Sequence, residues 1–152
     1  MSKHLGNVLE PMPLMNQHGA DAVRWYMLAA GSPWSARRVG HDAISDVVRK
    51  SLLTYWNTVS FFTLYAKAAN FQVSSLPANP HLMDRWIISE LNKLIAGVDH
   101  ALENFDSQEA GNLLGAFIDD LSNWYVRRSR RKFWDGDADA LNTLYHLSLI
   151  HI

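Results

Sequence analysis

Cysteine is absent from the 152 residues of the chain, so the sequence excludes disulfide bonds and metal sites built from thiolates. This absence fits a reducing compartment, and we predict a cytoplasmic location. No apolar run is long enough to cross a bilayer, and the polar N-terminus lacks the apolar core of a signal peptide. We therefore expect no membrane partner. The seven histidines are scattered, with no pair at the i, i+4 spacing of a helical metal site, so we expect no bound metal.

A large net charge is also absent, because 14 basic residues nearly balance 15 acidic ones and leave −1. Binding to nucleic acid would therefore need local clustering of basic residues. Such a cluster is present, since five of the six positions from 127 to 132 are basic and aromatic residues stand on both sides of them. The basic residues are Arg127, Arg128, Arg130, Arg131 and Lys132, and the aromatic ones are Trp124, Tyr125, Phe133 and Trp134.

Apolar residues recur at spacings of three and four along most of the chain, which is typical of amphipathic helices. Proline and glycine break this pattern repeatedly between residues 8 and 36, whereas the later segments are long. No alternating run is strong enough to predict a substantial sheet. We predict a mainly all-α fold in which a small helical module precedes an antiparallel helix bundle. The expected helices are 13–18, 21–30, 42–70, 80–105, 106–134 and 138–149.

For two of these helices, the sequence also predicts which side chains are buried. In the helix 42–70, Trp56 and its neighbours widen the apolar face, so we expect this helix to be buried on more than one side. In the helix 106–134, we expect Trp124 and Tyr125 to lie in the core and not to stack on a ligand.

The basic cluster cannot present a single face, because an α-helix turns about 100° per residue. Arg127, Arg131 and Trp134 share one face, while Arg128 and Lys132 share a neighbouring one. We interpret the cluster as a contact for RNA phosphates, with the aromatic rings available for stacking or for packing against guanidinium planes. The alternative is a solvated helix end, which the negative end of the helix dipole favours. Some of the cations would pair with acidic neighbours, namely Asp119, Asp120, Asp135 or Asp137.

Several stretches are similar, in the same order, to motifs of one enzyme family. Residues 1–7 read M-S-K-H-L-G-N and are similar to the lysine loop K-M-S-K-S; residues 19–24 read G-A-D-A-V-R. Residues 119–134 read D-D-L-S-N-W-Y-V-R-R-S-R-R-K-F-W, and shorter matches lie at 32–35 and 47–58. The chain thus resembles class I aminoacyl-tRNA synthetases of the isoleucyl type.

This resemblance covers residues 1–146 and implies a division of the chain. Residues 1–40 would hold the lysine loop and the stem-contact fold of class I enzymes. Residues 41–146 would form the anticodon-binding helical bundle, incomplete at its C-terminal end. Residues 147–152 depart from the family pattern, and we expect them to be a non-native tail. His4 also departs from it, because the family usually has serine there.

The same resemblance implies roles for particular residues. Lys3 would stabilise the phosphate of ATP during transfer, and Ser2 would help to hold the ATP-bound loop. The parent enzyme would use ATP with Mg²⁺ to charge tRNA(Ile), whereas this chain alone would retain no cofactor and no ligase activity. Its partners would be tRNA(Ile) and the catalytic domain of the same protein, with no role for DNA. The tRNA contacts would be Arg127, Arg128, Arg130, Arg131, Lys132 and Trp134.

Two alternatives remain open at the level of sequence. A valyl-type enzyme is the nearest, although such enzymes tend to replace the arginines after the Trp-Tyr pair. The second is a non-catalytic helical interaction module whose basic patch binds an acidic protein.

Overall fold

The structure, a computed structural model, describes residues 9–32, 34–36, 38–76 and 80–149. Throughout these ranges the regular elements are helices, and no strand is present. The predicted all-α fold is confirmed. Lys3 and Ser2, and the rest of the predicted lysine loop, lie outside the described residues.

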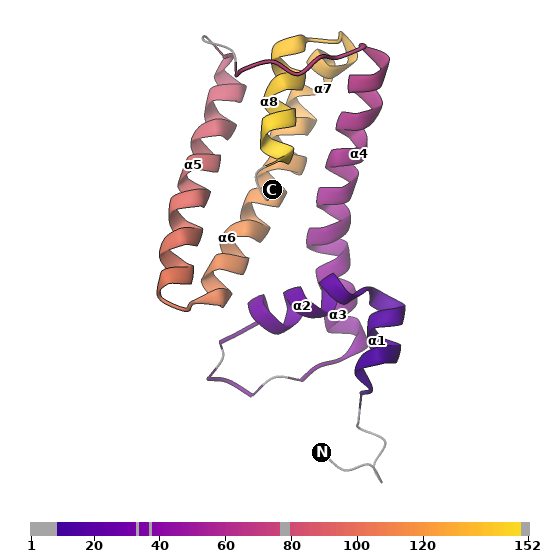
Figure 1. The fold of residues 1–152 in the computed structure, drawn as a ribbon, viewed down its shortest axis with the longest axis vertical. Helices are drawn as coiled ribbons and strands as arrows, with labels where there is room; N and C mark the ends of the chain where they lie inside the picture. The colour runs from indigo at the N-terminus through magenta and orange to yellow at the C-terminus, as the bar shows by residue number, and fades with distance from the viewer. Residues whose placement is uncertain (1–8, 33, 37, 77–79, 150–152) are drawn as a thin grey trace.

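A small module of short helices lies at the lower end of the molecule in Figure 1. It consists of α1 (Pro11–His18), α2 (Ala20–Ala29) and α3 (His41–Val47). Gly19 ends α1 with φ of +88°, a backbone conformation that suits glycine, and so allows α2 to begin at the next residue. The module has its own apolar core, formed by Leu14, Ala22, Val23, Tyr26 and Ile44.

The first long helix leaves this module without a break. From α3 it passes through a π-helical segment, η2 (Val48–Leu52), into α4 (Leu53–Ala68). The predicted continuous helix from 42 to about 70 is confirmed, but the wide turn of η2 was not predicted. The prediction that this helix is buried on more than one side is wrong at Trp56, whose side chain is 68% exposed.

The remaining helices complete an antiparallel bundle (Figure 1). The chain runs up along α4, down along α5, up again through a third long helix and down along α8. Asp106 and Asp137 cap α6 and α8 by accepting a hydrogen bond from a backbone N–H in the first turn. The elements are α5 (Leu82–Glu103), α6 (Ser107–Asp119), η3 (Asp120–Val126), α7 (Arg127–Trp134) and α8 (Ala138–Ser148).

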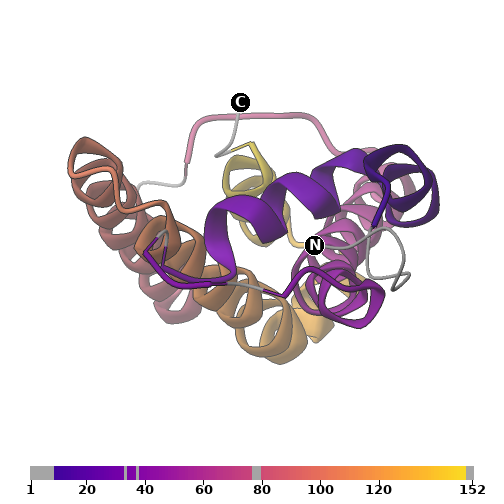
Figure 2. The same ribbon diagram turned by 90° about the horizontal axis from the view of Figure 1, so that it is seen from below.

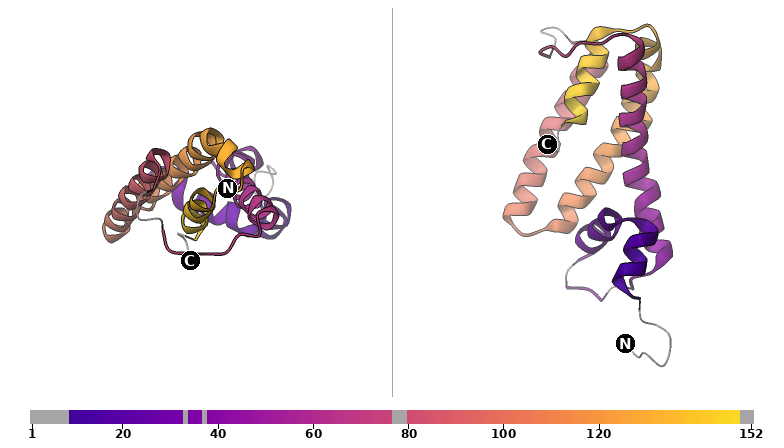
Figure 3. Two further views of the ribbon diagram at one scale, coloured as in Figure 1. Left: turned by 90° about the horizontal axis from the view of Figure 1, so that it is seen from above. Right: turned by 45° about the vertical axis from the view of Figure 1, so that its right-hand side comes forward.

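The main core lies where α5, η3, α7 and α8 meet, and α4 packs against it. Its centre includes Ile87, Tyr125, Phe133, Leu141 and Leu144, none of which is more than 1% exposed. Figure 3 shows this arrangement from above, with α8 seated between α4 and α5. The antiparallel bundle predicted from the apolar spacing is therefore confirmed.

A polar contact fixes the connector that crosses from α4 to α5. Asn142, buried in α8, accepts a hydrogen bond from the Ser74 backbone N–H at 3.1 Å and donates one to the Ser75 carbonyl oxygen. The Nε2 atom of His146 lies 3.0 Å from the Ser74 carbonyl oxygen. These contacts satisfy backbone groups that no sheet or helix supplies with partners.

The module and the bundle meet at a close helix–helix approach. Figure 2 shows α2 lying across the lower end of the bundle. The Ser107 hydroxyl donates a hydrogen bond of 2.8 Å to the Leu28 carbonyl oxygen. One turn later, a methyl group built on Gly111 would lie only 2.1 Å from Cβ of Ala29. The absence of a side chain at Gly111 therefore sets how closely α2 and α6 approach.

We predict that Gly111→Ala lowers the free energy of unfolding by roughly 1–3 kcal/mol, because the added methyl forces the two helices apart. Gly115→Ala on the same helix is the matched control, since a methyl there meets nothing within 4 Å. It should raise the stability by roughly 0.5–1 kcal/mol, the helix preference of alanine over glycine. Urea unfolding followed by circular dichroism measures both. If the two substitutions stabilise the protein equally, the space between α2 and α6 at Gly111 accommodates a methyl group and the prediction is wrong.

Candidate functional site

Along its upper half, the third long helix, α6–η3–α7, buries Leu121 and every fourth residue after it, together with Val126. Leu121, Tyr125, Ser129 and Phe133 point into the bundle. The four arginines lie between these buried positions, and Arg127, Arg128, Arg130 and Arg131 are all exposed. The arginines thus spread around the solvent side of α7 near the upper end of the bundle (Figure 1), away from the small module.

A buried carboxylate holds this helix in place. Asp84, in the first turn of α5, has no exposed surface. Its Oδ1 accepts a 2.7 Å hydrogen bond from the Tyr125 hydroxyl, and its Oδ2 lies 3.4 Å from Nζ of Lys132. Burial, and then the charge of Asp84, raise the pKa of Tyr125 above its usual value. The hydroxyl therefore stays protonated and remains a donor at physiological pH.

This arrangement separates Lys132 from the other cations of the cluster. Its side chain is 29% exposed and turns inward to Asp84, whereas the predicted role was contact with tRNA. The inward position gives Lys132 a fully buried acidic partner, whereas the acidic partner of Arg131 is exposed. A contact between Lys132 and RNA stays a prediction, and the four arginines are the more exposed cations of the cluster.

Trp124 is a correction to the sequence analysis. We expected it in the core, but it is 48% exposed, because Tyr125 and Leu121 occupy the inward positions of this helix. The guanidinium carbon of Arg128 lies 4.6 Å from the centre of the Trp124 ring, in a cation–π contact. Tyr125, in contrast, is fully buried as expected. Trp134 at the end of α7 is 63% exposed.

The arginines differ in their acidic neighbours. Arg131 lies 3.9 Å from Asp135, which confirms one of the ion pairs expected from the sequence, although both side chains are largely exposed and such a pair contributes little. Arg127 and Arg130 have no acidic group within ion-pair distance among the described residues. These two cations are thus available to an external anion.

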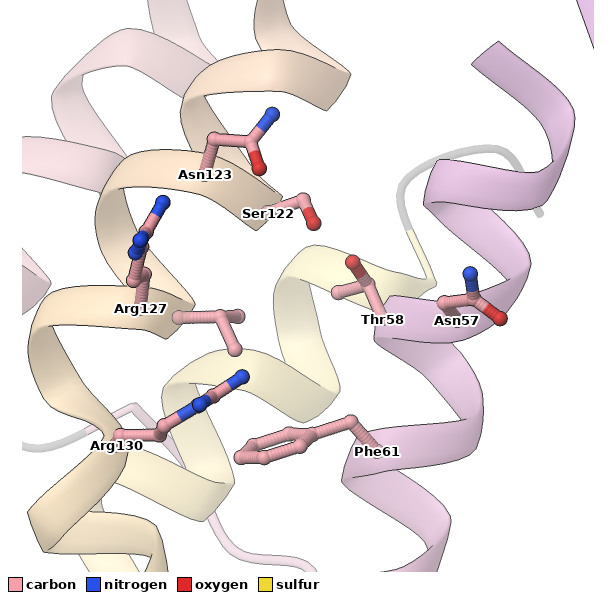
Figure 4. Close-up of a pocket in the computed structure, with 8 residues that line it drawn as sticks. Asn57, Thr58, Phe61, Ser122, Asn123, Arg127 and Arg130 are labelled. Atoms are coloured by element: carbon pink, nitrogen blue, oxygen red, sulfur yellow. The ribbon is translucent and has the colours of Figure 1, made fainter. Parts of the chain in front are cut away.

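Arg127 and Arg130 also border a cleft of about 270 Å³ between α4 and the third helix. Figure 4 shows Arg130 and Phe61 entering it from opposite sides, and Thr58 facing Ser122 across it. No carboxylate lines the cleft, whose walls come from Asn57, Thr58, Phe61, Ser122, Asn123, Val126, Arg127 and Arg130.

Sequence reasoning found the arginines of this cleft but missed the residues on its other wall. Asn57 and Thr58 stand about 70 positions before Arg127 and read as ordinary polar positions of an amphipathic helix. Ser122 likewise carries no pattern of its own. Only the pairing of α4 with η3 brings these residues opposite the arginines.

Within the described ranges, no group of three or more histidine, aspartate or glutamate side chains is placed to hold a metal ion. No helix there is both long and apolar enough to cross a bilayer. Asp21 and Arg24 form a 2.7 Å ion pair on the surface of α2. The Arg38 carbonyl oxygen accepts a hydrogen bond from the Tyr26 hydroxyl.

Comparison with known proteins identifies the chain's relatives. Residues 84–150 match the family model of the anticodon-binding domain of tRNA ligase. Isoleucine--tRNA ligase from Streptomyces avermitilis is 62% identical over 97% of the chain, and the enzyme from Thermobifida fusca is 61% identical over 95%. The Deinococcus radiodurans enzyme is 42% identical over 98%.

The chain is homologous to isoleucine--tRNA ligases. The expected resemblance to the isoleucyl type is thereby confirmed. The chain spans only 14–15% of the length of these three ligases. The matched family model begins at Asp84, in the first turn of α5, and includes the whole basic cluster. The boundaries predicted at residues 40 and 146 stay predictions, as does the non-native origin of 147–152, although Leu147 is buried in the core.

We predict that Asp84→Ala lowers the free energy of unfolding by roughly 2–4 kcal/mol, because it leaves the Tyr125 hydroxyl buried without an acceptor and removes the partner of Lys132. The matched control is Asp99→Ala, an exposed aspartate on the same helix, which should change the stability by less than about 0.5 kcal/mol. Thermal and urea unfolding measure the difference. If the two variants unfold alike, the network contributes nothing to stability.

Proposed function

We propose that this chain is the tRNA-binding segment of an isoleucine--tRNA ligase and that its arginine face contacts the phosphates of tRNA(Ile). The observation that supports this most directly is the position of Arg127 and Arg130. Both are exposed, lack acidic partners in the described part of the chain, and lie inside the region that matches an anticodon-binding domain. Guanidinium groups bind phosphate oxygens in pairs of parallel hydrogen bonds, which suits them to an RNA backbone.

The aromatic residues favour RNA over an acidic protein as the partner. Trp124 holds its ring against Arg128 while about half of its surface remains exposed. Trp134 is more exposed still. Unpaired bases stack on such rings and on guanidinium planes, whereas the carboxylates of an acidic protein pair with the guanidinium groups alone. A non-catalytic module that binds an acidic protein is therefore the second candidate.

The proposal extends to the whole ligase in which such a segment works. There, Lys3 would place its ammonium group against the ATP phosphates, with Mg²⁺ neutralising further charge, and Ser2 would support the loop. The bundle would hold the tRNA so that its acceptor end reaches the catalytic domain. The reaction would be the ATP-dependent joining of isoleucine to tRNA(Ile) in the cytoplasm.

RNA binding by the 152-residue chain should weaken steeply with salt. If the four exposed arginines each displace about one counterion, the logarithm of the binding constant should fall with that of the salt concentration with a slope of about −3 to −4. Replacing both Arg127 and Arg130 with glutamine should reduce the slope to about −2. Lys93→Gln, which removes a cation already paired with Glu90 on α5, is the control. Filter binding with tRNA(Ile) measures all three.

The specificity of this binding separates the candidates. Tighter binding of tRNA(Ile) than of tRNA(Val) supports the proposal, provided that a thermal melt shows each protein folded. Equal and weak binding of both tRNAs and of polyglutamate would favour the module that binds an acidic protein.

The isolated chain should not catalyse isoleucine-dependent exchange of pyrophosphate into ATP. Most of the length of the homologous ligases has no counterpart in these 152 residues, and a lysine loop without a nucleotide-binding domain cannot position ATP for attack. Exchange measured with labelled pyrophosphate checks this, with a complete isoleucine--tRNA ligase as the positive control. Turnover above the no-protein background would contradict the expectation.

A further inference from the structure

The turn between α5 and α6 contains a residue in a conformation that is rare for its type. Phe105 has a φ of +58°, in the left-handed region that glycine or asparagine usually occupies at the end of a helix. This conformation lets the Asp106 N–H donate a hydrogen bond of 2.8 Å to the Ala101 carbonyl oxygen, which closes α5 directly before α6 begins. The turn therefore needs a left-handed residue, but nothing in the turn needs that residue to be phenylalanine.

The ring of Phe105 also lies almost wholly in solvent, with 92% of its surface exposed. Leu102, in the last turn of α5, is 52% exposed. Leu28, whose carbonyl oxygen accepts the hydrogen bond from Ser107, is 60% exposed. We call Leu28, Leu102 and Phe105 the tip patch; it lies at the lower end of the molecule in Figure 1. A strained backbone that carries an exposed aromatic ring is typical of a contact with something outside the chain.

Carboxylates surround the tip patch. Residues 99–109 contain four acidic residues and no lysine or arginine. All four are exposed, and none of them forms an ion pair in the described part of the chain. They are Asp99, Glu103, Asp106 and Glu109. The surface that covers the patch must therefore bring positive charge around an apolar centre.

This charge narrows the choice of partner. RNA is a poor match because its phosphates would face four carboxylates, and the arginines that attract RNA stand near the opposite end of the bundle (Figure 1). A two-fold contact between copies of the chain would place the same carboxylates against each other. The homologous ligases, in contrast, are several times longer, since the chain spans only 14–15% of their length. Tethering holds the rest of such a polypeptide near the tip at high effective concentration.

We propose that the tip patch docks into an apolar pocket, rimmed by lysine or arginine side chains, on another part of the same ligase polypeptide. Phe105 fills the pocket, and the four carboxylates pair with its rim. The inference rests on the part of the proposed function that makes this chain a segment of a ligase, and it does not depend on RNA binding by the arginines. Such a contact anchors the lower end of the bundle and leaves the arginine face open.

The first test maps the neighbour of Phe105 in a complete ligase. Residues 1–146 replace the homologous stretch of the Streptomyces avermitilis enzyme, and the photoreactive residue benzoylphenylalanine replaces Phe105 in this chimaera. Ultraviolet light should link the ring to a peptide of the same polypeptide that lies outside the replaced stretch and carries lysine or arginine. Mass spectrometry identifies the link. The same probe at Ser89, an exposed position of α5 outside the tip patch, is the matched control and should give no such link.

The second test is a substitution whose effect should change sign between two proteins. In the 152-residue chain, Phe105→Gly removes an exposed ring and relaxes the backbone, so Tm should stay the same or rise by about 1–3 °C. In the chimaera the same change removes the docked ring, and Tm should fall by at least about 3 °C. Leu82→Ala, which trims another exposed apolar side chain of α5, should shift Tm by less than about 1 °C in both proteins. Differential scanning calorimetry measures all of these shifts.

Four results would overturn the inference. If the probe at position 105 links to nothing and Phe105→Gly stabilises both proteins, the tip faces solvent and the proposed function still stands. Links between two ligase molecules would assign the patch to self-association, and links to added tRNA(Ile) would assign it to RNA. If the unsubstituted chimaera melts cooperatively but catalyses no isoleucine-dependent exchange of pyrophosphate into ATP, the proposed function fails and the inference fails with it.

Discussion

The orientation of the third long helix depends on one carboxylate. Asp84 has no contact with solvent, so the free energy of placing its charge inside the bundle must be offset by the Tyr125 hydroxyl and the Lys132 ammonium. Both partners stand on the third helix, and Asp84 itself lies in the first turn of α5. The network therefore fixes the rotation of the third helix about its own axis. With Tyr125 inside, the neighbouring arginines can only lie outside.

This constraint links packing to function. The buried residues at every fourth position fill the core, and the arginines between them form the surface that we propose for RNA. The same rotation places Ser122 and Val126 opposite α4 and so completes the cleft beside Phe61. The basic cluster, for which the sequence left a solvated helix end as an alternative, is in three dimensions the outer side of a well-packed core helix.

Sequence patterns predicted where the helices lie, but they did not predict correctly which side of each helix is buried. Spacings of three and four located the long helices. In the structure Asp106 and Asp137 cap the starts of α6 and α8, and Gly19 ends the short helix α1, as capping chemistry leads one to expect. Trp124 was misplaced because an aromatic side chain next to a buried tyrosine has no sequence feature that separates core from surface. Trp56 was misplaced because a wide apolar face of a helix is buried only where another helix covers it. The far wall of the cleft could not be predicted, since it depends on which helices pair.

The wide turn at η3 has a consequence for how this segment tolerates change. A π-helical stretch holds more residues per turn than an α-helix. The side chains after Val126 therefore point in directions that differ from those of an unbroken α-helix continued from Asp119. Gain or loss of one residue inside that stretch would rotate everything beyond it by about 100°. The lower half could keep its packing against α5, while Phe133 would leave the core and a guanidinium group would enter it. The length of this seven-residue stretch is thus a constraint in its own right, independent of which side chains fill it.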